Sequence, residues 1–337
     1  MSRPLLSICV CTYRRPHLAR TLRSLAAAVA AVPDAPATEI VVADDDTRPS
    51  ARPIVDGFGA EHDLPVAYRH VASGNISVAR NACLDAARGD LVAFVDDDER
   101  VERGWLAALL ARRAETGADV VLGPVRALYP AGAPRWMRAA DPHGTRPVLV
   151  RGEIRTGYTC NVLMDVRAPA LGGRRFDRRR GRTGGEDTAF FDAARRAGAR
   201  IAFAPEAWAE EDVTPERLAF GWLARRRFRS GQTHASLLAA DHLSAVARAR
   251  AVGLAGAKAL WCGGAAALAL PVATARNRAL LRGALHLGAV ASLLGRRDLA
   301  LYGGPDLGSH PRPDPRPDIG SKPGPGPDHA PGAEAAS

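Results

Sequence analysis

The chain has few aromatic residues and few cysteines. Aromatic side chains make up 5% of the 337 residues, and only Cys9 and Cys11 of the five cysteines are close together. An odd, scattered set of cysteines favours a reducing compartment over one in which disulfides form. We interpret Cys9 and Cys11 as small buried residues of an apolar run, because no second pair is present to complete a metal site.

Three other features are missing from the sequence. The segment Met-Ser-Arg-Pro at the start leads into a strand-like run and not into the long apolar core of a signal peptide. We therefore expect the protein to act in the cytoplasm. No basic stripe interleaved with aromatic residues is found, which argues against nucleic acid as a partner. No internal repeat is found either.

The net charge of +10 belongs to the C-terminal part of the chain. Residues 217–300 carry 13 Lys and Arg but only 2 Asp and Glu, a balance of +11, so the remaining residues sum to −1. A basic module of this kind could face an anionic membrane or a phosphate-bearing substrate. A solvated basic face without a partner is the alternative, and the charge alone does not decide between them.

Strand and helix patterns alternate in the first half of the chain. Apolar runs predict strands at 6–11, 39–43, 66–70, 91–95 and 120–125, and helical spacing predicts helices at 15–32, 76–87 and 102–116. Continuous apolar strands that alternate with helices predict an α/β fold, with a mostly parallel sheet covered on both faces. Further on, we expect a loop at 129–156, strands at 161–165 and 200–204, and a helix from 188 to 197.

Two acidic runs directly follow predicted strands. Asp44, Asp45 and Asp46 follow the strand at 39–43, and residues 96–98, three further aspartates, follow the strand at 91–95. Ligands bind at the carboxyl ends of strands in open α/β sheets. Carboxylates crowded at this edge repel one another unless a cation or hydrogen-bond donors compensate.

The D-x-D formed by Asp96 and Asp98 points to a divalent cation. Alternate residues of an extended segment point the same way, so both carboxylates can face one ligand. Mn²⁺ and Mg²⁺ prefer carboxylate and phosphate oxygens. Such a cation would stabilise the charge on a departing nucleoside diphosphate. The alternative is a solvated acidic turn that caps the next helix.

Five motifs in the expected order resemble the family 2 inverting glycosyltransferases. They are SICVCTYRR at 7–15, VVADDDT at 41–47, GNISVARN at 74–81, FVDDDE at 94–99 and GGEDTAFF at 184–191. The resemblance implies the GT-A fold, which is Rossmann-like. Within the family, the chain looks most like the bacterial succinoglycan-type glucosyltransferases, which build extracellular polysaccharide.

The resemblance also implies a binding site for the donor nucleotide. Thr12 and Arg14 match the segment that lines the nucleotide pocket. Asp44 matches the acidic residue that hydrogen-bonds the base, usually uracil, and Asp45 is its neighbour. Arg80 matches an arginine at the nucleotide end of the pocket, where a guanidinium suits a base edge or a diphosphate.

The remaining site residues are expected around the reacting bond. Asp96 resembles the D-x-D residue near the ribose, Asp98 resembles the metal ligand, and Asp97 is expected to support them. Asp187 matches the catalytic base, which takes a proton from the acceptor hydroxyl, and Glu186 would orient the donor sugar or the acceptor. For the pair 186–187 alone, the alternative is an acidic cap on the following helix. The preceding glycines, Gly184 and Gly185, would let the backbone approach a sugar closely.

The C-terminal part reads as helices of two kinds. Residues 217–250 look helical and basic, and Arg226, Arg227 and Arg229 could contact phosphate or face solvent. The Q-x-x-R-W motif of processive members does not occur at 222–232, so we infer a non-processive enzyme. Apolar stretches follow at 251–273 and 279–295, and the first contains Lys258. We expect them to attach peripherally to the cytoplasmic face of the membrane, with a soluble helical pair as the alternative.

Together these features predict three parts of the chain. Residues 1–215 would form the GT-A domain, 216–303 a basic helical module associated with the membrane, and 304–337 a disordered Pro/Gly-rich tail. The predicted function is transfer of a sugar from a nucleoside-diphosphate donor to a saccharide or lipid-linked acceptor, and the resemblance implies a UDP-hexose as the donor. A nucleotidyltransferase and a non-catalytic nucleotide-sugar-binding module are the alternatives.

Overall fold

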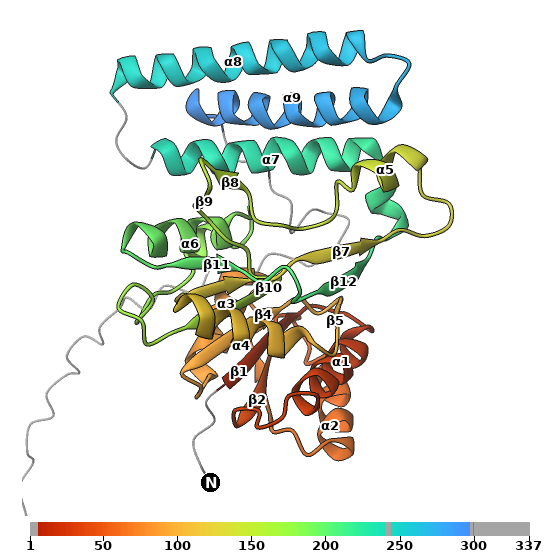
Figure 1. Cartoon of the computed structure of the whole chain (residues 1–337), viewed down its shortest axis with the longest axis vertical. Coiled ribbons are helices and arrows are strands. Elements are labelled where there is room, and N and C mark those ends of the chain that lie inside the picture. Colours follow the sequence, from red (N-terminus) through yellow and green to blue (C-terminus); the bar gives the residue numbers. More distant parts are fainter. Residues whose placement is uncertain (1–5, 240–243, 297–298, 300–337) are drawn as a thin grey trace, which may run out of the picture. The chain divides into compact units, whose positions relative to one another are not determined.

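A seven-stranded sheet organises the first two thirds of the chain (Figure 1). The computed structural model describes residues 6–239, 244–296 and 299. The strand order is β11 (Ile201–Phe203), β6 (Val120–Leu122), β10 (Asn161–Asp165), β4 (Leu91–Val95), β1 (Leu6–Thr12), β2 (Thr38–Asp44) and β3 (Val66–His70). Only β10 runs antiparallel to its neighbours, which confirms the predicted mostly parallel sheet.

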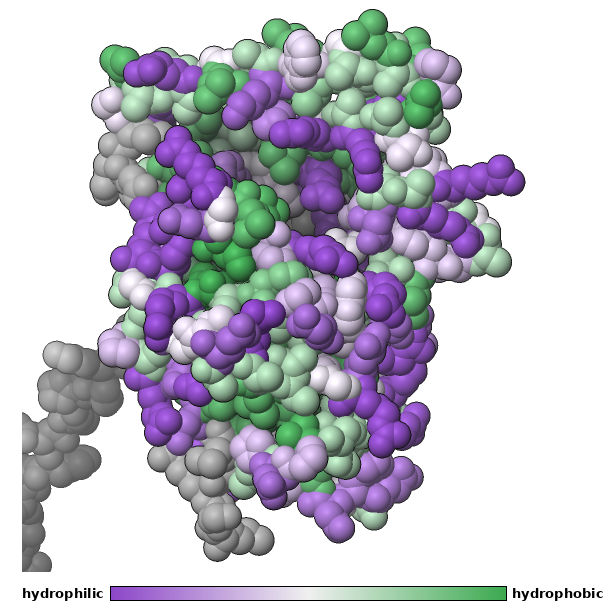
Figure 2. All heavy atoms as spheres, in the orientation of Figure 1, coloured by the Kyte–Doolittle hydropathy of each residue, from purple (hydrophilic) through white to green (hydrophobic). Residues whose placement is uncertain are grey.

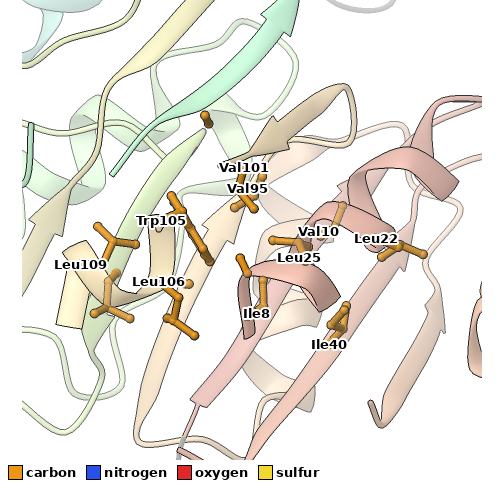
Figure 3. Close-up of a cluster of buried hydrophobic side chains, with 14 of the residues drawn as sticks. Ile8, Val10, Leu22, Leu25, Ile40, Val95, Val101, Trp105, Leu106 and Leu109 are labelled. Atoms are coloured by element: carbon orange, nitrogen blue, oxygen red, sulfur yellow. The ribbon is translucent and has the colours of Figure 1, made fainter. Parts of the chain in front are cut away.

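Helices cover both faces of this sheet, as predicted. One face carries α1 (Leu18–Ala30), α2 (Arg52–Glu61) and α4 (Trp105–Thr116), and the other carries α3 (Ile76–Ala86) and α6 (Glu186–Arg196). Because the sheet is buried on both sides, the middle residues of its central strands are apolar. In Figure 3, Ile8 and Val10 of β1 pack against Leu25 of α1, with Trp105 of α4 nearby.

The predicted strand at 120–125 ends early, at Leu122. Gly123 then packs so tightly that an added Cβ would lie 2.4 Å from the Asn161 side chain, and Pro124 has no N–H for a ladder. The chain therefore leaves the main sheet and enters a second one, with the order β5 (Glu99–Val101), β12 (Ala209–Asp212) and β7 (Val125–Leu128).

The stretch predicted as a loop at 129–156 contains short regular elements. These are α5 (Arg135–Ala140) and a hairpin of β8 (Leu149–Val150) and β9 (Glu153–Ile154). Short 3₁₀ helices occur at Arg178–Arg180 and Pro215–Leu218. The loop prediction at 129–156 was therefore wrong for α5, β8 and β9, which are too short to show a period in the sequence.

Three long helices form the C-terminal part: α7 (Phe220–Ala239), α8 (Ala245–Leu268) and α9 (Ala273–Leu293). α9 packs against both α7 and α8 and lies between them in Figure 1. Glycines allow α7 and α9 to touch: a Cβ on Gly231 would lie 1.8 Å from the Leu285 carbonyl oxygen, and one on Gly288 would lie 1.9 Å from that of Phe228. By length and composition, α8 is the one described helix that could cross a membrane.

The expected division of the chain at 215/216 remains a prediction. The described residues up to 299, including α7, α8 and α9, belong to one compact unit. The predicted disordered tail at 304–337 lies outside the described residues.

Candidate active site

The three aspartates at the end of β2 accept hydrogen bonds from the surrounding loops. Asp44 is fully buried, and its carboxylate accepts hydrogen bonds from the Ala51 N–H at 2.8 Å and the Tyr68 hydroxyl at 2.8 Å. Asp45 accepts from the backbone N–H groups of residues 73, 74 and 75 at 2.6–3.0 Å. Both carboxylates are thus occupied by protein donors, and their predicted contact with the nucleotide base remains a prediction.

The third aspartate of this run fixes the predicted nucleotide-binding arginine. The Arg14 Nε donates to Asp46 Oδ1 at 2.9 Å, and the Arg14 side chain is 41% exposed. Burial by itself raises the pKa of Asp46, but the hydrogen bonds to its carboxylate, above all the one from Arg14, lower this pKa by more. The net pKa lies below the usual value for aspartate, so the carboxylate is charged. Thr12, the last residue of β1, is buried beside this loop, and its carbonyl accepts from the Asp45 N–H. Arg14 is therefore held at the edge of the sheet, accessible to a ligand.

The D-x-D carboxylates lie at the end of β4, where two arginines face them. Asp98 Oδ2 lies 3.4 Å from Arg15 Nη2 and 3.8 Å from Arg217 Nη2. Asp97 is buried and accepts a hydrogen bond from the Tyr13 N–H at 3.4 Å, so it supports the segment as expected. Asp96 is the most accessible of the three, with 46% of its side chain exposed.

Negative charge accumulates around the D-x-D. The β5–β12 pairing sets Glu211 directly opposite Glu99, which is 1% exposed. Desolvation raises the pKa of Asp96 to about 7, although one side of its carboxylate remains open to solvent. The charge of Arg80 lowers this pKa, and the charges of Asp98 and Glu211 raise it. Desolvation and the neighbouring carboxylates Asp96 and Glu211 also raise the pKa of Glu99. The carboxylates of Asp96, Glu99 and Glu211 therefore repel one another, and a bound cation would reduce this repulsion.

Arg80 joins the D-x-D to the second acidic centre. It projects from α3, is 7% exposed, and forms an ion pair with Glu186 of α6. Its Nη2 lies 3.8 Å from Asp96 Oδ1. Burial would lower the pKa of Arg80, but the charges of Glu186, Asp96 and Asp187 raise it. The two acidic segments, nearly a hundred residues apart in the sequence, therefore border a common centre.

Glu186 and Asp187 form the first turn of α6, two residues earlier than the predicted helix start. Glu186 is 5% exposed, and burial followed by the Asp187 charge raises its pKa, while Arg80 lowers it. Its second oxygen, Oε2, is buried without a hydrogen-bond partner among the described residues. Asp187 is only partly buried, and its Oδ1 accepts from the Thr188 N–H at 2.6 Å. Asp187 is therefore the freer of the two carboxylates.

Gly185, directly before α6, makes room for a protein side chain. Gly184 and Gly185 have φ values of +83° and +82°, which favour glycine. A Cβ on Gly185 would lie 2.4 Å from the Thr233 side chain on α7. The expected approach to a sugar is therefore corrected: at Gly185 the close neighbour is α7.

The predicted phosphate contact of Arg229 is also corrected. Arg229 is 2% exposed, so it neither faces solvent nor is available to a ligand. It donates to the carbonyl of Thr183 at 2.5 Å and to that of Gly184 at 2.8 Å. Its neighbour Arg227 donates to the Pro142 carbonyl at 3.3 Å. Arg229 thus supports the loop that presents the Glu186-Asp187 pair.

Comparison with known proteins identifies the family. The family model "Glycosyl transferase family 2" matches residues 7–176. The succinoglycan biosynthesis protein ExoM of Rhizobium meliloti (strain 1021) is 51% identical over 304 residues, which cover 90% of this chain and 97% of that protein. The chain belongs to glycosyl transferase family 2. The prediction of a glycosyltransferase with a family 2 sequence is confirmed.

Two more distant proteins resemble this family 2 glycosyltransferase. The pre-mycofactocin glycosyltransferase of Mycobacterium tuberculosis (strain H37Rv) is 29% identical over 212 residues, which cover 60% of this chain and 43% of that protein. The mannosyltransferase of Pyrobaculum calidifontis, solved with GDP-Man and Mn²⁺, has a TM-score of 0.57 and 20% identity, covering 88% of this chain and 89% of that one. The likeness confirms the predicted fold.

The carboxylates of this glycosyltransferase could hold a divalent cation only together with a ligand. No group of three or more His, Cys, Asp or Glu side chains suited to a metal ion occurs among the described residues. Asp96 and Asp98 supply two carboxylates, and a hard cation needs about six oxygens. The diphosphate of a donor and water would supply the rest. The surplus negative charge around Asp96 fits this arrangement.

Sequence reasoning missed four charged residues of the site. Arg15 and Glu99 lie inside quoted motifs but had no assigned role, while Glu211 and Arg217 lie beyond the last motif. Glu211 is placed by the β5–β12 pairing, and Arg217 by its ion pair with Glu211. No periodicity marks a strand as polar as Ala-Glu-Glu-Asp, so the sequence offers no local signal for these two.

Proposed function

We propose that this enzyme transfers one sugar, with inversion, from a nucleoside-diphosphate donor to a hydroxyl of a saccharide or lipid-linked acceptor. The observation that carries the proposal is the position of Arg80 between Asp96 and Glu186, which unites the D-x-D with the acidic pair of α6. The likeness to ExoM, a succinoglycan biosynthesis protein, supports a role in cell-surface polysaccharide synthesis. The missing Q-x-x-R-W motif supports addition of a single sugar.

Asp98 and Asp96 would hold Mn²⁺ or Mg²⁺ against the donor diphosphate. When bound, the cation offsets the negative charge that the diphosphate gains as it leaves. Arg15 and Arg217, which flank Asp98, are placed to meet phosphate oxygens as well. Thr12 and Arg14 would line the nucleotide pocket.

Asp187 fits the role of general base better than Glu186 does. A base must reach the acceptor hydroxyl and be free to take its proton. Glu186 is buried and ion-paired with Arg80, whereas Asp187 is partly exposed and its carboxylate accepts hydrogen bonds only from Thr188 among the described residues. We assign Glu186 to holding Arg80 in place.

The proposed step is a single displacement at the anomeric carbon. The acceptor oxygen forms a bond to that carbon while the bond from the carbon to the diphosphate oxygen breaks. The electron pair of the broken bond stays on the diphosphate, and the hydroxyl proton moves to the Asp187 carboxylate. Attack from the face opposite the leaving group inverts the configuration.

Donor turnover by Asp187→Asn tests the role of the base. The measurement is release of nucleoside diphosphate from a donor sugar, with Mn²⁺ or with a chelator. We expect a loss of about 10²–10⁴-fold in kcat for Asp187→Asn, with donor binding retained. The matched control is Asp192→Asn on the same helix, whose carboxylate pairs with Arg195 and Arg196, and it should turn over normally.

Two results would contradict the proposal. Equal turnover by wild type and Asp187→Asn would remove Asp187 as the base. Donor binding without any turnover in the wild type would favour the non-catalytic binding module. A panel of UDP-, GDP- and dTDP-sugars, screened for thermal stabilisation with Mn²⁺, would identify the nucleotide; we propose that UDP-hexoses stabilise most.

We also propose that the basic C-terminal module predicted at 216–303, through its described helices α8 and α9, attaches the enzyme to the cytoplasmic face of the membrane. Leu260 and Leu268 on α8 are 80% and 90% exposed, which is unusual for large apolar residues of a soluble helix. Attachment would bring the site near a lipid-linked acceptor. Flotation of the full chain with vesicles tests this proposal separately from turnover.

A further inference from the structure

A basic pocket separate from the candidate active site lies between α8 and α9. Its volume is about 350 Å³, which is within the range of small-molecule sites, roughly 300–1,000 Å³. Lys258 and Trp261 of α8 line one side, and Arg278, Arg282 and His286 of α9 line the other. We call these five residues the α8–α9 basic pocket.

The packing of the two helices brings its cations together. Only four residues separate α8 from α9, so the helices run back along each other. Gly283 faces Cys262, and a Cβ on this glycine would lie 3.3 Å from the Cys262 Cβ. Arg278 and Arg282, one turn apart on α9, therefore sit across from Lys258.

The charge of this pocket is not neutralised by acidic residues of the helices. The sequences of α7, α8 and α9 contain no Asp or Glu. In the part of the chain that the structure describes, none of the three cations lies within ion-pair distance of a carboxylate. Burial, followed by the charges of Lys258 and Arg282, lowers the pKa of His286, as expected in a positive field. Lys258, Arg278 and Arg282 are all exposed, so water solvates them in the free protein, but an anion that entered the pocket would meet three positive charges at once.

The surface around the pocket is apolar. Trp261 is 78% exposed beside it, and Leu254 and Leu260 are 59% and 80% exposed on the same helix. Figure 2 shows green, apolar residues over α8 at the top of the view, with purple side chains next to them. A soluble phosphate or a nucleic acid would leave these side chains in water. A bilayer covers them, and tryptophan favours the interface between headgroups and acyl chains.

We propose that the α8–α9 basic pocket binds the phosphate of an anionic membrane lipid, while the exposed face of α8 lies in the interfacial layer of the bilayer. This inference rests on the proposed membrane attachment and names its ligand. Arg278 and Arg282 can offer planar donor pairs to phosphate oxygens, and Lys258 adds a point charge. The pocket thus selects phosphate and not only negative surface charge.

The test compares two vesicle types of equal surface charge. One contains phosphatidylcholine with phosphatidic acid, and the other contains phosphatidylcholine with oleate, adjusted to the same zeta potential. Flotation of the full-length protein gives its affinity for each. The variant is Arg278→Gln/Arg282→Gln. The matched control is Arg248→Gln/Arg250→Gln, which removes the same charge from the exposed first turns of α8, outside the pocket.

We expect the wild type to bind the phosphatidic acid vesicles roughly tenfold more tightly than the oleate vesicles. The pocket variant should lose this preference, whereas the control should keep it even if its overall binding falls. Equal binding of the wild type to both vesicles, binding to neither, or a preference retained by the pocket variant would overturn the proposal. Transfer to a soluble acceptor without vesicles should be unchanged in the pocket variant, which separates this result from a failure of the proposed activity.

Discussion

Removal of Arg80 offers a direct test of how the site is held together. Arg80 and Glu186 have side chains that are 9% and 6% exposed and form an ion pair. Arg80→Met keeps much of the apolar volume but leaves Glu186 buried without its cation, so its carboxylate must either stay charged in a desolvated site or take up a proton. Its Oε2 already has no hydrogen-bond partner among the described residues, so nothing nearby replaces the lost guanidinium.

The expected magnitude follows from this burial. Breaking a buried pair by removing one partner costs about 3–5 kcal/mol of unfolding free energy. Glu186→Gln should cost less, because Arg80 keeps the charges of Asp96 and Asp187 nearby. In the double variant Arg80→Met/Glu186→Gln, the buried charge at position 186 is gone, and Asp96, which also loses Arg80, has 46% of its side chain exposed to water. We expect its stability to recover to within about 1–2 kcal/mol of the wild type.

Urea unfolding at neutral pH measures these stabilities, and kcat/KM for donor turnover measures function. Turnover should stay low in the double variant, because Arg80 no longer links Asp96 to α6. Arg88→Met is the matched control: Arg88 pairs with buried Glu39 at the amino ends of β2 and β4, opposite to the carboxyl ends that carry the site, so this variant should lose stability without losing turnover. A loss below about 1 kcal/mol in Arg80→Met, or strictly additive single effects, would refute the reasoning.

Three other predictions test separate features of the structure. Gly185→Ala should destabilise the protein by about 1–3 kcal/mol and reduce turnover, because φ is +82° and the new Cβ would meet Thr233. The control Gly59→Ala has open space around the new Cβ and should change neither stability nor turnover. Equal melting temperatures of the two variants would contradict this. His143 is 3% exposed, and burial lowers its pKa to about 4, so between pH 6.5 and 4 the unfolded chain binds a proton that the folded protein does not. As the pH falls through this range, the wild type should therefore lose up to roughly 3 kcal/mol of unfolding free energy relative to His143→Gln. A difference in urea midpoints that does not change with pH would contradict this. Chelation should abolish turnover and Mn²⁺ restore it; full activity in excess chelator would exclude the role proposed for Asp98.

Local patterns predicted the parts of the fold that depend on local sequence. The strands at 66–70, 91–95 and 161–165 were predicted to the residue, because each contains at least three consecutive apolar residues. The helix Arg52–Glu61 was missed because Pro53, Gly57 and Gly59 interrupt its pattern. The second sheet was missed because its central strand is acidic and is defined by its partners, β5 and β7.

The site shows the same division between local and non-local information. The D-x-D was predicted from residue type and position, and the acidic pair at 186–187 from the family resemblance; the structure brings the two segments together through Arg80. The burial of Arg229 could not be read from a basic helix, because its partners are carbonyls of a loop some forty-five residues earlier. Likewise, nothing in three consecutive aspartates reveals that Asp44 is already saturated by backbone and Tyr68 donors.

The contact between α7 and the loop before α6 has a consequence for engineering. Arg229 on α7 donates hydrogen bonds to the carbonyls of residues 183 and 184, and Thr233 on α7 fills the space beside Gly185. A chimera that takes residues up to 215 from one parent and the rest from another would combine this loop with an α7 from a different protein. Such a hybrid can lose turnover although every residue that touches the donor is unchanged, and junctions placed after α9 avoid that loss.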